Sequence, residues 1–315
     1  MADEIHLEIA PPDIASYRAG NRGIPYVTTF DSELPGPHAV MMALIHGNEI
    51  CGAVALDHLF RAGGIRPARG RITLAFGNVE AYRRFDRRKP AASRYVDEDL
   101  NRVWAPSALD GHRANTELAR ARQLRPVIDS ADFLLDLHSM NDGRTPLLLA
   151  GLTEKTLAFA RRMGAPAIIV RDKGHPAGPR LRDYGDFADR LAPRIAVLVE
   201  CGQHWEKAAA EFAIAASLRF LAASGVLDEA RAASYLAKPS PQRVIEVSET
   251  VVAASADFRF VADYRGLEIV PLAGTPIARD GGRDIVTPYD ECVLVMPSRN
   301  LVPGQTAVRL GRYTA

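Results

Sequence analysis

Cysteine is scarce in this chain of 315 residues. The three cysteines, Cys51, Cys201 and Cys292, lie far apart, and no two of them form a CxxC pair. This spacing argues against a disulfide framework and against a zinc site built from cysteine ligands. Isolated cysteines fit a reducing compartment, so we expect a cytoplasmic location.

An excess of either charge is also missing. Lys and Arg together number 39 and Asp and Glu 38, which leaves a formal net charge of +1. No long-range field therefore recruits nucleic acid or an anionic membrane, and we expect a small molecule as the partner. The N-terminal residues MADEIHLEIAPPDI carry acids where a signal peptide has a basic segment, which argues against secretion.

Long hydrophobic runs and several well-known motifs are absent too. The most apolar long stretch, Ala208 to Val226, contains Glu211 and Arg219 and has helical periodicity, which indicates a core-packing helix rather than a membrane span. The sequence has no GxGxxG, GxxxxGK[ST], GxSxG or HExxH motif. The usual support for dinucleotide, nucleotide, serine-hydrolase and thermolysin-like functions is therefore missing.

What is present, over about the first 230 residues, is an alternation of short apolar runs and longer helical patterns. This alternation predicts an α/β fold with a mostly parallel or mixed sheet flanked by helices. The expected strands are Ala39 to Ile45, Ile72 to Phe76, Phe133 to Leu137, Leu147 to Leu149, Ala167 to Val170 and Ala196 to Val199. The expected helices are Ile50 to Ala62, Thr116 to Asp129, Glu154 to Met163 and Trp205 to Ala223.

The pattern changes after residue 235. The segment from Ala237 to Pro241 has the composition of a linker, and short β-type segments punctuated by Gly and Pro follow it. The expected strands there are Val244 to Val247, Val251 to Ala254, Phe258 to Val261, Leu267 to Val270 and Cys292 to Met296. We therefore expect a larger domain of residues 1–235 and a smaller, all-β domain of residues 242–315.

A histidine and a carboxylate follow the first predicted strand, which runs into His46-Gly47-Asn48-Glu49 just before a helix. Open α/β sheets bind ligands at the carboxyl ends of their strands. Because Gly47 permits a tight turn, His46 and Glu49 could converge on one metal ion. An HxxE triplet alone is a weak signal, since a lone histidine is more often a surface or capping residue.

A second histidine, His138, follows the strand Phe133 to Leu137. Side chains alternate along a strand, so Asp136 shares a face with His138 and either orients its imidazole or caps a neighbouring loop. With His46 and Glu49, His138 completes the set of two histidines and one glutamate that is typical of a catalytic zinc with one position open for water.

A glutamate follows a third strand, because Ala196 to Val199 runs directly into Glu200. Burying a carboxylate costs free energy unless it is paired or neutral, so its position needs a reason. One reason is a general base that takes a proton from a metal-activated water and passes it to the leaving amine. The other is a capping or salt-bridged glutamate.

Arginines lie between the first two ligand segments, in the run RYVDEDLNR from Arg94 to Arg102. A guanidinium stays charged and can hold a carboxylate through two parallel hydrogen bonds. Arg102 with Asn101 could therefore hold a substrate carboxylate, and Arg94 could face a carbonyl oxygen as it gains negative charge. The alternative is a solvated loop of mixed charge.

In this order, the motifs HGNE, NxxA, RYVDEDLNR, DLH and ExG resemble those of the aspartoacylase and succinylglutamate desuccinylase family, part of the wider zinc carboxypeptidase superfamily. The resemblance covers His46 to Gly202. It implies a catalytic α/β domain followed by a C-terminal β domain. It also implies an enzyme that uses one zinc ion per chain to remove the acyl group of an N-acyl amino acid.

The resemblance further implies a role for each matching residue. Zinc would be held by His46, Glu49 and His138, with Glu200 as general base and acid and Arg94 as the group that stabilises the oxyanion. Substrate carboxylates would be bound by Asn101, Arg102 and Arg190, with Asp99 supporting the loop. Asp186 stands where the family has a substrate-contacting tyrosine, so the acyl group and the amino acid stay open.

Two other functions also stay open. A metallocarboxypeptidase would use the same zinc, glutamate and arginines to cut a C-terminal peptide bond, but the added β domain is typical of deacylases in which it narrows the cleft. A non-catalytic zinc-binding protein of the same fold is disfavoured because all three ligands and Glu200 are present. Relatives commonly self-associate, so a homo-oligomer is an open option.

Overall fold

The computed structural model describes residues 6–61, 65–228, 233, 241–299 and 301–314. Its N-terminal part contains the strands β1 (Val27–Asp31), β2 (His38–Ala43), β3 (Arg71–Phe76), β4 (Phe133–Met140), β5 (Leu147–Leu149), β6 (Ile168–Arg171) and β7 (Ile195–Gln203). The strands β3, β2, β4 and β7 lie side by side and are parallel, while β1 and β5 are antiparallel to their neighbours β3 and β7. The sheet is therefore mixed and mostly parallel at its centre.

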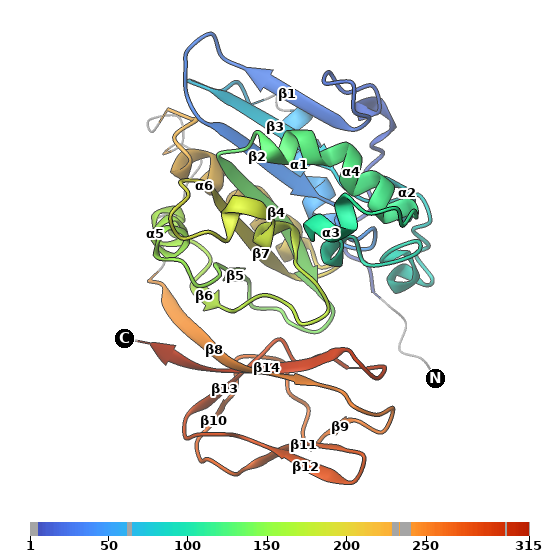
Figure 1. Ribbon diagram of the computed structural model, residues 1–315, viewed down its shortest axis with the longest axis vertical. Helices are drawn as coiled ribbons and strands as arrows, with labels where there is room; N and C mark the ends of the chain where they lie inside the picture. The colour runs from blue at the N-terminus through green and yellow to red at the C-terminus, as the bar shows by residue number, and fades with distance from the viewer. Residues whose placement is uncertain (1–5, 62–64, 229–232, 234–240, 300, 315) are drawn as a thin grey trace.

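Helices cover both faces of this sheet (Figure 1). They are α1 (Ile50–Arg61), α2 (Val79–Tyr82), α3 (Pro106–Leu109), α4 (Thr116–Asp129), α5 (Glu154–Met163) and α6 (Lys207–Ala223). Short 3-10 helices span Ala15–Tyr17, Pro90–Ser93, Leu100–Arg102, Leu181–Asp183 and Gly185–Phe187. The helices α1 and α6 pack together on one face, and α4 packs on the other.

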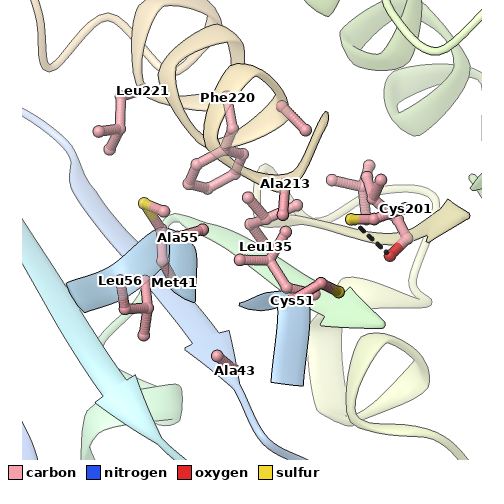
Figure 2. Close-up of a cluster of buried hydrophobic side chains, with 14 of the residues drawn as sticks. Met41, Ala43, Cys51, Ala55, Leu56, Leu135, Cys201, Ala213, Phe220 and Leu221 are labelled. Carbon is pink, nitrogen blue, oxygen red and sulfur yellow. Dashed lines mark hydrogen bonds between the residues drawn. The ribbon is translucent and has the colours of Figure 1, made fainter. Parts of the chain in front are cut away.

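The strand β2 shows why the central strands read as continuous apolar runs. All six of its residues are buried, and successive side chains point to opposite faces of the sheet. Met41 joins the hydrophobic cluster that includes Ala55 of α1 and Phe220 of α6 (Figure 2). Met42 joins the cluster on the α4 face. A buried strand end is therefore held between two helical layers.

The C-terminal part contains β8 (Arg243–Val252), β9 (Arg259–Phe260), β10 (Ile269–Val270), β11 (Pro276–Asp280), β12 (Arg283–Val286), β13 (Cys292–Val295) and β14 (Thr306–Thr314). Because β8 pairs with β6 on one side and with β14 on the other, the eleven-stranded sheet continues through β14, β13 and β10. The strands β12, β11 and β9 form a second, antiparallel sheet. The division into residues 1–235 and 242–315 stays a prediction, and residues 237–240 of the expected linker lie outside the described residues.

The predicted fold class is confirmed, and several predicted elements agree with the structure to the residue, among them α4, α5 and β5. Two predicted C-terminal strands are parts of the one strand β8, whose pairing with β14 has register shifts. The strand β14 was missed because the buried Arg309 interrupts its apolar pattern. No helix in the described part of the chain is long and apolar enough to cross a bilayer.

Candidate active site

The first candidate ligands lie on the turn between β2 and α1. The amide of Gly47 donates to the Arg94 carbonyl at 3.0 Å, and the amide of Glu49 donates to the His46 carbonyl at 3.2 Å. A side chain at Gly47 would meet the backbone of Ala81 at 2.5 Å, so only glycine fits this close approach. The turn thereby brings the His46 Nδ1 atom within 2.7 Å of Glu49 Oε1.

The third candidate ligand, His138, lies near the carboxyl end of β4. Its Nδ1 atom is 2.9 Å from Glu49 Oε2, and its Nε2 atom is 2.9 Å from Asp136 Oδ2. Asp136 therefore contacts the outer nitrogen of the imidazole, which is the orienting arrangement that the alternation of strand side chains predicts. The amide of Ser139 donates to Glu49 Oε2 at 3.0 Å and holds that carboxylate in place.

The side chains of His46, Glu49 and His138 form one buried cluster in which a ligand atom of each lies within 4.8 Å of those of the others. Both imidazoles turn Nδ1 toward Glu49 and Nε2 toward a second carboxylate. This second carboxylate is Asp99 for His46 and Asp136 for His138. Two nitrogens and one carboxylate oxygen make up a donor set that zinc prefers, and outer carboxylates commonly support such histidines. The residues present therefore fit a zinc ion.

The charges in this cluster depend on one another. Burial by itself raises the pKa of Glu49, but the neighbouring His46 and His138 overcome this and hold that pKa well below its ordinary value. Burial likewise lowers the pKa of His138, yet Asp136 and Glu49 raise it well above the ordinary value. A proton on His138 thus stabilises the buried carboxylate, and a divalent cation bound between the three side chains could take its place.

Glu200 lies on β7 directly beside His138 of β4, as its partner in the parallel register. Burial raises the pKa of Glu200 to about 8, while the charges of His138 and Arg94 act against the shift. Its Oε2 atom is buried and has no hydrogen-bond partner among the described residues. The side chain is therefore neither a helix cap nor half of a salt bridge here, which leaves its carboxylate available for a proton.

Arg94 and Asp99 complete the wall of the cluster. The Arg94 guanidinium donates to Glu49 Oε1 at 3.1 Å and to Asp99 Oδ2 at 3.2 Å, and 37% of its side chain remains exposed. Burial raises the pKa of Asp99, but His46 and Arg94 overcome this and hold it well below its ordinary value. Asp99 therefore remains a carboxylate that orients both His46 and Arg94.

Asn101 and Arg102 lie on the short helix that follows Asp99. The Asn101 side-chain oxygen accepts from the Leu181 amide at 2.6 Å, and its nitrogen lies 3.2 Å from His138 Nε2. Both ends of this amide therefore contact protein groups. The Arg102 guanidinium donates to the Asn101 carbonyl at 2.7 Å, lies 3.7 Å from Asp99 and keeps 21% of its side chain exposed.

Arg190 is not brought to this cluster. It is exposed in the segment before β7, and no hydrogen bond or ion pair of the described residues joins it to the candidate ligands. In the segment before β7, Arg180 is an arginine whose charge acts on Glu200, and its guanidinium donates to Asp172 Oδ2 at 2.8 Å. The expected substrate contact of Arg190 therefore stays a prediction.

Sequence reasoning also missed the buried groups that surround Arg180. Asp172 receives hydrogen bonds from Arg180 and Arg182, and the Nε atom of Arg309 on β14 lies 3.6 Å from it. Asp172, Arg180 and Arg182 lie close together in the sequence, but Arg309 lies far along the chain, and the four match no motif. The signal that identifies them is burial of charge, which appears only in the folded protein.

The sequence of this chain is similar to that of known proteins. Residues 35–223 match a family model described as the succinylglutamate desuccinylase/aspartoacylase catalytic domain. A succinylglutamate desuccinylase of Pseudomonas aeruginosa is 35% identical over 101 residues, which are 31% of this chain and 27% of that protein. A probable aspartoacylase of Parasynechococcus marenigrum is 36% identical over 125 residues, which are 38% of this chain and 39% of that protein. The chain thus covers well under half the length of both relatives.

Solved structures resemble a larger share of the chain. A succinylglutamate desuccinylase structure from Vibrio parahaemolyticus has a TM-score of 0.68 and 18% identity, with 92% of this chain and 87% of that chain covered. At this level of identity the likeness establishes the fold. It extends over the C-terminal strands as well as the part that carries the cluster.

Proposed function

Because the chain belongs to the succinylglutamate desuccinylase and aspartoacylase family, we propose that it is a zinc-dependent hydrolase that removes an acyl group from the amino group of an amino acid. Relatives named as a succinylglutamate desuccinylase and a probable aspartoacylase support a hydrolase of the deacylase type. The observation that carries the finer proposal is the buried cluster of His46, Glu49 and His138, with Glu200 beside it on the neighbouring strand.

His46, Glu49 and His138 would hold the zinc ion, and Asp99 and Asp136 would orient the two imidazoles. When bound, zinc would act as a Lewis acid on the scissile carbonyl and lower the pKa of a water molecule. All three ligand side chains are buried between packed strands and α1, so their positions are set before any substrate arrives.

Glu200 would move the proton. Its carboxylate, free of protein hydrogen bonds in the described part of the chain, would accept a proton from the attacking water and donate it to the leaving amine. The raised pKa that burial gives Glu200 favours the second half of this transfer, because a raised pKa makes the carboxyl group hold its proton until the amine takes it. Arg94, which is partly exposed and fixed by Glu49 and Asp99, would face the carbonyl oxygen as it gains negative charge.

Arg102 would bind the α-carboxylate of the amino acid. Its guanidinium is partly exposed and has one firm acceptor, the Asn101 carbonyl, so further donors remain for a substrate. Asn101 would support this contact by orienting His138 and by holding the Leu181 segment. The predicted substrate contact of Arg190 forms no part of this proposal, because that residue is exposed and lies outside the cluster. A cytoplasmic enzyme is consistent with three free, buried cysteines.

The test is a screen of two substrate classes against zinc-loaded protein, with release of primary amine as the signal. The classes are acetyl, succinyl and aroyl derivatives of the common amino acids, and short peptides. The Glu200→Gln protein, purified in parallel, is the control for contaminating hydrolases. Release from at least one N-acyl amino acid by the wild type alone is expected. Cleavage restricted to the C-terminal residue of peptides would instead establish a carboxypeptidase, and no release from either class would contradict the proposal.

A further inference from the structure

Glu117, the second residue of α4, is fully buried although it carries a carboxylate. Its Oε1 atom accepts from the Asn78 side-chain amide at 2.8 Å and from the Val96 backbone amide at 2.7 Å. Its Oε2 atom accepts from the backbone amides of Asp97 at 3.0 Å and Glu98 at 3.2 Å. Each oxygen thus receives two hydrogen bonds, which is the full accepting capacity of a carboxylate.

The three backbone donors are consecutive residues of the loop that carries the proposed catalytic groups. Residues 96–98 lie between Arg94 on one side and Asp99 and Arg102 on the other. At its start, the loop is held where the Arg94 carbonyl accepts from Gly47. Glu117 fixes the middle of the loop, so it constrains the path in space that the chain takes between the two arginines.

Neighbouring groups at the start of α4 strengthen this contact. The amide of Thr116 donates to Asp97 Oδ2 at 2.8 Å, and the side-chain amide of Asn115 donates to Glu98. Asn115 also caps α4 by accepting from the Leu118 amide. The loop is therefore docked against the first turn of a 14-residue helix that packs on the sheet.

On these contacts we propose that Glu117 is a positioning residue, which holds residues 96–98 so that Arg94 and Arg102 face the same substrate. The proposal rests on the function proposed above, because it concerns the geometry of that reaction. None of the four groups that donate to the Glu117 carboxylate belongs to a proposed zinc ligand, so its role is separate from holding the metal.

These contacts explain why an uncharged side chain of the same shape should not hold residues 96–98 in place. In Glu117→Gln the amide NH₂ group replaces one oxygen, and both oxygens face two N–H donors. Whichever way the amide turns, its NH₂ group therefore meets donors, and buried N–H groups lose their acceptor. Glu117→Asp keeps the charge but is one methylene shorter, so it cannot reach all four donors at once.

The experiment compares wild type, Glu117→Gln and Glu117→Asp in zinc content, amide hydrogen exchange and kinetics on the best substrate of the screen. We expect unchanged zinc content and exchange about tenfold or more faster at Val96, Asp97 and Glu98. We expect kcat/KM to fall about 10- to 100-fold through a lower kcat together with a higher KM. A protein that is merely less stable would lose active fraction, which lowers apparent kcat without raising KM. If Glu117→Gln does not fold, Glu117→Asp is measured alone.

Asp280 offers a matched control, because it also holds a loop by its carboxylate. It accepts from the backbone amides of Ala254 at 2.6 Å and Ser255 at 3.0 Å, and it lies on β11 in the C-terminal part. Asp280→Asn should lower thermal stability and leave kcat and KM unchanged. Faster exchange at residues 96–98 with normal kinetics, or wild-type exchange rates in both Glu117 variants, would overturn the proposal. A wild type that releases no amine would contradict the proposed function, and hydrogen exchange would still decide whether Glu117 holds the loop.

Discussion

Glu200→Gln is the substitution that tests the proposed reaction most directly. Glutamine has nearly the same shape as glutamate, and no hydrogen bond among the described residues uses the Glu200 carboxylate. The exchange therefore breaks no hydrogen bond or ion pair of the side chain among the described residues. It also removes the cost of burying a charge at a site where burial raises the pKa to about 8. We accordingly expect the variant to fold and to hold its zinc.

The expected loss is confined to the proton transfer. An amide cannot accept the proton of the attacking water or return it to the amine, and loss of a general base typically lowers the rate by about 10² to 10⁴. At about 1.4 kcal/mol for each factor of ten, this raises the activation free energy by about 3 to 6 kcal/mol. KM should change little, because Arg94 and Arg102, the groups assigned to the substrate, stay in place.

Three measurements on the same preparation separate these effects. Zinc content should match the wild type, the melting temperature should not fall, and kcat should drop by the factor above. Glu206→Gln is a suitable control, because Glu206 follows on the same segment but pairs with Arg144 at 3.1 Å outside the cluster. A Glu200→Gln enzyme with near-normal kcat would refute the reasoning and show that another group accepts the proton.

Further predictions concern the metal, the two arginines and the pH dependence of stability. His46→Ala and His138→Ala should each lose most bound zinc in metal analysis, since a three-ligand site cannot spare one ligand, and full occupancy in both would contradict the assignment. Arg94→Ala should lower kcat about 10² to 10³-fold with less effect on KM. Arg102→Ala should chiefly raise KM. Steady-state kinetics in which both variants changed the same constant would contradict these separate roles of the two arginines. Burial lowers the pKa of His38 to about 4. As the pH falls from about 6.5 to 4, the unfolded chain therefore binds a proton at this residue while the folded chain does not. The free energy of unfolding decreases over this range by about 3 kcal/mol from this residue. Urea unfolding of His38→Gln should show a weaker loss between pH 7 and 5 than the wild type, and an equal loss would contradict the role of this histidine.

The order of elements and part of the site could be predicted because they depend on short-range patterns. Apolar runs and helical spacing identified the central strands and most helices. Glycine and the HGNE spacing identified the turn that brings His46 to Glu49, and the strand that ends near His138 supplied the third ligand. Parallel strands carry their carboxyl ends to one edge of a sheet, so the fold class predicts that these three side chains converge. In the structure their ligand atoms lie within 4.8 Å of one another. Their occupation by zinc stays a prediction.

The tertiary structure alone decided which distant polar groups meet. Nothing local marks Glu117 as the acceptor of the amides at 96–98, because it lies about twenty residues along the chain on a helix that reads as an ordinary amphipathic one. The same holds for Arg309, which reaches Asp172 only because β14 pairs with β8 and β8 with β6. The charge of Arg180 acts on Glu200 for a related reason, since the path of an irregular segment depends on what it packs against. Secondary structure follows from backbone geometry over a few residues, whereas a buried charge is stabilised by partners from anywhere in the chain, and those partners are selected only when the layers pack.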